Sequence, residues 1–285
     1  MPPRLVRTRL SSMGGSLTSE RVSRASRDAS RRLRSRVTPA ALILAVLSIL
    51  IMCLAPGAVA QSSTVQSSTT ATISPSLSPD RLGAEGALQL TIRYATGESG
   101  VPSPVRRSVL RFPEGLGVEI PHLRSCSLTR LRTRGPSACP AQSLLGHGHA
   151  LAEAEAGSQI ISEGIDLSLF VGPFHNLQPT FEILGQGYTP FDERVVLTGT
   201  VIPDQAPFGE DLVLSIPPIP TLPLEPDASI VTMSLTVGAS KPRRPITVNT
   251  IVVPPSCPAG GFPFAAEFTY ADGSTDSALA SAPCP

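Results

Sequence analysis

The sequence predicts an all-β fold, an antiparallel β-sandwich behind an N-terminal signal peptide. Apolar and polar residues alternate with a period of two in many short segments, and Gly, Pro or Asp residues separate most of these segments. Beyond the N-terminal part, no window of about a dozen residues has the 3.6-residue apolar period of a helix. Short strands with turns at this spacing predict sheets that pack face to face.

The composition excludes several classes of protein. The chain is 41% hydrophobic and 16% charged, with 30 Pro and no Trp, which does not fit a charged disordered chain, a multi-span membrane protein or a coiled coil. The net charge of +1 conceals two opposite parts. Residues 1–60 hold ten Arg and two acidic residues, whereas the remainder holds 13 basic and 20 acidic residues. This asymmetry indicates a targeting segment at the N-terminus.

Residues 1–60 have the features of a signal peptide for export. An Arg-rich stretch precedes 16 apolar or small residues, 40–55, fewer than the ~20 that a membrane-spanning helix needs. Ala58-Val59-Ala60 has the small-x-small form of a cleavage site. We expect cleavage after Ala60 and a secreted or cell-envelope-associated protein. The alternatives are retention as an N-terminal anchor, in which case the uncleaved segment would attach the chain to a membrane, and lipidation at Cys53.

The remainder divides into a linker and a sandwich region. Residues 61–79 are rich in Ser and Thr and are expected to form a flexible linker. Residues 80–285 are long enough for one large or two small tandem sandwiches. The Pro-rich residues 217–227 cannot lie inside a sheet, because Pro lacks the N–H donor, so a sub-boundary is expected there if two sandwiches exist. Strands are predicted at 88–94, 107–112, 144–155, 160–171, 178–185, 194–202, 211–216, 231–237, 247–253, 263–270 and 276–282.

Four cysteines remain after the signal peptide: Cys126, Cys139, Cys257 and Cys284. In an oxidising compartment an even set predicts disulfide bonds. Three pairings are open, of which the sequence-local one joins Cys126 to Cys139 and Cys257 to Cys284. A zinc site is the alternative, but the chain has no C-x2-C pair and no His close to a Cys. We therefore expect no cofactor.

Two cysteine-containing segments carry a resemblance to other proteins. These are C-S-L-T-R-L-R-T-R-G-P-S-A-C-P and S-C-P-A-G-G-F-P-F-A-A-E-F-T-Y-A-D-G-S, followed by the terminal P-C-P. Together they resemble secreted, Arg-rich and Lys-poor β-sandwich proteins of unknown function from high-GC Gram-positive bacteria. The resemblance extends over residues 80–285 and implies no activity and no site residues.

The segment G-H-G-H-A-L-A-E-A-E at 146–155 is the best candidate for metal chemistry. On a strand, His147, His149 and Glu153 project from one face, and two imidazoles at i and i+2 with a carboxylate nearby can hold Zn²⁺. The alternative interpretation is the polar outer side of a strand whose Ala and Gly side packs on the core.

Four arginines, Arg124, Arg130, Arg132 and Arg134, concentrate positive charge in and beside the predicted Cys126–Cys139 loop. This loop could bind an anionic polymer through salt-sensitive contacts. The alternative is a solvated loop that follows the general preference of this chain for Arg. Nucleic acid is not an expected partner, because the charge after residue 60 is negative and no aromatic residues interleave with the basic ones.

Residues 170–191 hold five of the twelve aromatic residues. They could form a ligand or partner surface at one end of the sandwich, or seal the end of its core.

No sequence motif of a hydrolase, P-loop or dinucleotide-binding protein is present. We therefore expect a non-catalytic binding or structural module of the cell envelope, with a cell-wall polymer or an extracellular protein as partner. A secreted metal-dependent hydrolase that uses the His-x-His face is the alternative.

Overall fold

Antiparallel strands make up most of the described chain. The computed structural model describes residues 69–96, 100–118, 123–189, 193–221, 225–238 and 251–284. The strands are β1 (Thr69–Ser78), β2 (Glu85–Thr96), β3 (Val105–Pro113), β4 (Gly117–Val118), β5 (Leu144–Ala156), β6 (Gln159–Val171), β7 (Thr180–Gly187), β8 (Arg194–Pro203), β9 (Phe208–Ser215), β10 (Ser229–Val237), β11 (Ile251–Val252), β12 (Phe262–Tyr270) and β13 (Thr275–Ala282). The predicted all-β class is confirmed.

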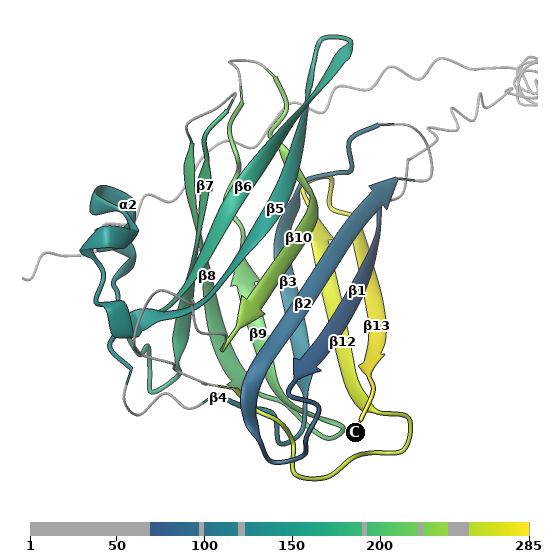
Figure 1. The fold of residues 1–285 in the computed structure, drawn as a ribbon. Helices are drawn as coiled ribbons and strands as arrows, with labels where there is room; N and C mark the ends of the chain where they lie inside the picture. Colours follow the sequence, from purple (N-terminus) through teal and green to yellow (C-terminus); the bar gives the residue numbers. More distant parts are fainter. Residues whose placement is uncertain are drawn as a thin grey trace, which may run out of the picture. The chain divides into compact units, whose positions relative to one another are not determined.

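These strands form one sheet in the order β13-β12-β3-β9-β8-β7-β6-β5-β10-β2-β11-β4. Strand β1 pairs with residues 87–96 of β2, on the edge of β2 opposite to β10. The sheet folds over on itself, so that β1 lies beside β13 (Figure 1). At this seam the backbone N–H of Ala71 donates a hydrogen bond to the Asp276 carboxylate at 2.6 Å. Across the interior, the ring of Tyr94 on β2 meets the ring of Phe268 on β12 edge-on, with centroids 5.2 Å apart. The inner faces therefore pack on each other as in a sandwich.

The period-two pattern places the apolar side chains inside. On β2 the four side chains predicted to share a face, Leu88, Leu90, Ile92 and Tyr94, are all buried. On β12 the same holds for Phe264, Ala266, Phe268 and Tyr270. Because successive side chains on a strand point to opposite faces, the intervening polar residues lie on the outer face of the sheet. The outer face is thus where a binding surface has room to form.

A single sandwich is present, because the strands before and after the Pro-rich segment belong to one sheet and one main core. Residues 216–221 and 225–228 have no strand of their own and connect β9 to β10. This connection is fixed by backbone hydrogen bonds from Ile216 N–H to Arg106 O and from Ala228 N–H to Ile219 O. All the described residues fall within one unit with its own core.

The flexible linker predicted for residues 61–79 is wrong for its second half. Residues 69–78 form β1, which pairs along its whole length with β2. Ala71 and Ile73 on its inner face are buried in the core. Residues 61–68 lie outside the described residues, as do the predicted signal peptide 1–60 and most of the strand predicted at 247–253.

Both sequence-local disulfides, Cys126–Cys139 and Cys257–Cys284, are formed, with Cα–Cα distances of 5.3 and 6.0 Å. Between Cys126 and Cys139 lie an unpredicted short helix, α2 (Leu128–Arg134), and a 3-10 turn, η1 (Pro136–Ala138); a second 3-10 turn, η2 (Ala141–Ser143), precedes β5. The helices in the described part of the chain are too short and too polar to cross a membrane.

Candidate functional site

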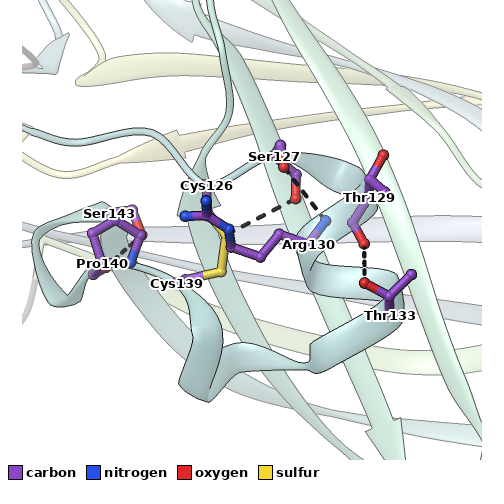
Figure 2. Close-up of a disulfide and its surroundings, with 8 residues drawn as sticks. All are labelled: Cys126, Ser127, Thr129, Arg130, Thr133, Cys139, Pro140 and Ser143. Carbon is purple, nitrogen blue, oxygen red and sulfur yellow. Dashed lines mark hydrogen bonds between the residues drawn. A yellow bond between two sulfur atoms is a disulfide. The ribbon is translucent and has the colours of Figure 1, made fainter.

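The Cys126–Cys139 loop covers part of the outer face of the sheet. Ser127 caps the start of helix α2, and its side chain accepts a hydrogen bond from the Arg130 N–H (Figure 2). Gly135, with a φ of +74°, follows the last residue of the helix and donates its N–H to Leu131 O. Leu131 is fully buried. It belongs to a second apolar cluster on the outer face, together with Cys126, Phe170, Leu184 and Val196. The disulfide and this cluster fix the helix on β6, β7 and β8.

Beside this cluster, four polar side chains form a row across the outer face. The strand register aligns His149 on β5, Asp166 on β6, Gln186 on β7 and Arg194 on β8. His149 Nδ1 lies 2.9 Å from Asp166 Oδ1. Arg194 Nε donates to Gln186 Oε1 at 2.9 Å, and Gln186 Nε2 donates to Gly187 O at 2.8 Å. The row therefore ends in a guanidinium whose orientation is set by its neighbour. We refer to these four residues as the polar row.

The polar row forms one side of a hollow of about 590 Å³ between the sheet and the disulfide loop. Its polar and aromatic lining residues outside the row are His147, Ser168 and Tyr188, and Pro136 contributes from the loop. Tyr188 is 61% exposed. A Cβ placed on Gly135 would lie 3.6 Å from Arg194 Cζ, so the guanidinium rests against the loop backbone. The volume falls in the usual range of ligand pockets.

Two groups of residues that the sequence analysis considered separately lie close together in the structure. His147 and His149 line the hollow, and the helix that carries Arg130, Arg132 and Arg134 lies beside it, because Pro136 follows that helix directly. All three arginines are exposed, as is Arg124, which precedes Cys126. Arg132 and Arg134 lie in the last turn of α2, where cationic side chains are favoured.

Glu153 lies away from the two histidines. It is four residues beyond His149 on β5, about 13 Å along an extended strand, and it accepts a hydrogen bond from Ser162 at 3.3 Å. Among the described residues, no group of three or more His, Cys, Asp or Glu side chains is arranged to hold a metal ion. The set His147, His149 and Glu153 is therefore not assembled as a metal centre, and the geometry lends no support to the hydrolase alternative.

Glu182 is a buried carboxyl group under the same loop. It is 3% exposed, and its Oε2 accepts a hydrogen bond from Thr198 at 2.9 Å. Burial raises the pKa of Glu182, and the Thr198 hydrogen bond and the charge of Arg132 lower it only in part. Arg132 on α2 is thus close enough to Glu182 for its charge to favour the ionised carboxylate.

The sequence analysis did not identify Asp166, Gln186 or Arg194, whereas Tyr188 belongs to the aromatic segment 170–191 that it proposed as a ligand or partner surface. Each of these residues lies in or next to a predicted strand, so the alternation of apolar and polar residues was sufficient to predict that its side chain projects from the outer face. Their alignment depends on the register between four strands, which no local pattern fixes. The aromatic segment is divided: Phe170 and Phe181 are buried, whereas Phe174 and Tyr188 are exposed.

The sequence matches no family model and no curated protein, and the fold matches no solved structure. The resemblance to secreted proteins of high-GC Gram-positive bacteria stays a prediction.

Proposed function

We propose that the chain is an exported, non-catalytic binding module of the cell envelope, and that the outer hollow holds an acidic polymer such as a cell-wall polysaccharide. The observation that carries the proposal is the orientation of Arg194. Its guanidinium is held between Gln186 and Gly135 at the side of the hollow, and among the described residues no carboxylate forms an ion pair with it. A pre-oriented guanidinium is suited to binding a carboxylate or phosphate oxygen.

The surroundings of Arg194 fit the same class of ligand. His147, His149, Ser168 and Tyr188 supply hydrogen-bonding groups around the hollow, and a partly exposed tyrosine offers both an apolar ring and a hydroxyl. The arginines of α2 add positive charge beside it. Two disulfides fit an extracellular location, where such polymers occur.

The test is binding of the oxidised chain to isolated cell wall and to immobilised acidic and neutral polysaccharides, at low and at high salt. We expect binding to the acidic polymer that weakens with salt. Arg194→Gln should weaken it at least about tenfold, the loss of one charge-assisted hydrogen bond. Arg107→Gln, an exposed arginine of β3 outside the hollow, is the matched control and should bind as the native chain does. Equal binding by both variants, or no binding to any acidic polymer, contradicts the proposal.

A further inference from the structure

The hairpin between β6 and β7 presents two apolar side chains to solvent. His175 and Gln178 exchange two backbone hydrogen bonds, each 2.9 Å long, and enclose Asn176 and Leu177 as a two-residue turn. The φ angles of Asn176 and Leu177 are +50° and +66°. Leu177 is 94% exposed and Phe174 is 59% exposed. The tip of the hairpin thus exposes Phe174 and Leu177 together with the polar His175 and Asn176.

Leucine is an unexpected residue at the position of Leu177. Positive φ at both central residues favours Asn and Gly, whereas a bulky side chain in the left-handed region is strained. Its side chain is almost entirely in water, so it stabilises nothing within the described chain. A strained and exposed apolar residue at a tip indicates a role in contact with something outside the chain.

The base of the hairpin holds the tip in place. Gly172 N–H donates to Thr180 O at 2.7 Å, and the Thr180 hydroxyl donates to Pro173 O at 2.5 Å. A Cβ on Gly172 would collide with the Thr180 hydroxyl, so glycine at this position leaves room for the hydrogen bond from that hydroxyl to Pro173 O. Pro173 and Pro179 restrict the backbone on both sides of the turn. Little conformational entropy is then lost when the tip binds.

Positive charge lies next to this base. The N–H of Cys126 donates to Val171 O, the last residue of β6, at 2.8 Å. This places the exposed Arg124, two residues earlier, beside the hairpin, and helix α2 follows directly after Cys126. At the neighbouring β8–β9 turn, the Asp204 and Asp211 carboxylates face the Arg111 guanidinium.

We propose that the 172–179 hairpin docks on the surface of an anionic lipid bilayer, with Phe174 and Leu177 entering the boundary between headgroups and acyl chains and Arg124 contacting the headgroups. A bilayer fits better than a protein, because a specific protein interface buries about 800 Å² per partner, far more than two side chains supply. Shallow insertion into the headgroup boundary needs no complementary surface, only apolar side chains and nearby positive charge. This inference is independent of the ligand in the outer hollow.

The experiment is sedimentation of the chain from Gln61, which contains every described residue, with vesicles of phosphatidylglycerol and phosphatidylcholine or of phosphatidylcholine alone. This chain excludes the apolar residues 40–55, which could bind lipid by themselves. We expect partition onto the anionic vesicles that falls about fivefold in Arg124→Gln, the effect of one basic side chain near a charged surface. Leu177→Asn should lower partition at least about tenfold, and it keeps the turn because Asn tolerates positive φ.

Leu279→Asn is the matched control, since Leu279 on β13 is 82% exposed but lies outside the hairpin. It should bind as the native chain does, and unchanged near-UV circular dichroism should show that all variants are folded. Arg194→Gln should also leave vesicle binding unchanged, which separates this proposal from the one for the hollow. Equal partition of Leu177→Asn and the native chain overturns the inference. So does absence of binding to anionic vesicles, and Leu177 would then belong to a contact with another protein.

Discussion

The carboxyl group of Asp211 lies on the outer face of β9, opposite Arg111 on β3. Asp211 is 8% exposed, and its Oδ2 is 3.9 Å from Arg111 Nε. Burial raises the pKa of Asp211 from 3.8 to about 6, a hydrogen bond with Asp204 and its charge add to the increase, and Arg111 opposes it. The folded protein therefore binds a proton at Asp211 more tightly than the unfolded chain does.

Because of this shift, protonation of Asp211 stabilises the folded protein at acidic pH. Because the pKa is raised on folding, the contribution is fully present below about pH 3.8 and is lost as the pH rises through about 6. The free energy of unfolding should fall by roughly 1–3 kcal/mol across this window. Urea unfolding at a series of pH values should show the decrease in the native chain and a flatter profile in Asp211→Asn. A parallel decrease in both would assign the effect to other groups.

At the scale of single residues, the sequence predicted which side chains of the candidate site face outward, but it did not predict which of them lie next to one another. The alternation in β5 identified the outward direction of His147 and His149, and the spacing of Glu153 along the strand shows why it does not join them. Asp166 and Arg194 became partners in the site only through strand register. Among the described residues the predicted set His147, His149 and Glu153 is not assembled, because sharing a face does not by itself bring residues within ligand distance of one another.

At the scale of elements, strands were predicted best and short or polar elements worst. Strand β1 was hidden because its outer positions are Ser and Thr, although Ala71 and Ile73 alternate with them. Helix α2 has only seven residues, too few for a periodic pattern, yet Ser127 and Gly135 occupy its caps. Capping residues would have been the better guide to this helix.

The Cys126–Cys139 disulfide should matter to function more than Cys257–Cys284 does. Replacing both Cys126 and Cys139 by Ala frees α2 and removes one wall of the hollow. We expect a loss of about 3 kcal/mol in the free energy of unfolding and loss of binding to the acidic polymer. The Cys257 and Cys284 double replacement should cost a similar stability, but it should retain binding, because this disulfide joins the segment before β12 to the end of β13. Binding that persists without Cys126 and Cys139 would contradict this assignment.

At the scale of the whole molecule, one sheet that folds over on itself accounts for the single core. A chain that begins at Asp80, the start of the sandwich region predicted from the sequence, lacks β1 and leaves the core beside Ala71 and Ile73 open. Compared with the chain from Gln61, it should lose at least about 3 kcal/mol in the free energy of unfolding, from the buried apolar side chains alone. Thermal unfolding of the two chains tests this, and equal midpoints would show that β1 is dispensable.

The seam between β1 and β13 also constrains when the native state can form. A ribosome synthesises β1 first of all the described strands and β13 last, about 200 residues later. The acceptor for the Ala71 N–H, the Asp276 carboxylate, is therefore missing until residue 276 has been synthesised. Before that point the nascent polypeptide has no closed interior, and it remains a substrate for chaperones and for any translocation machinery that accepts only unfolded chains.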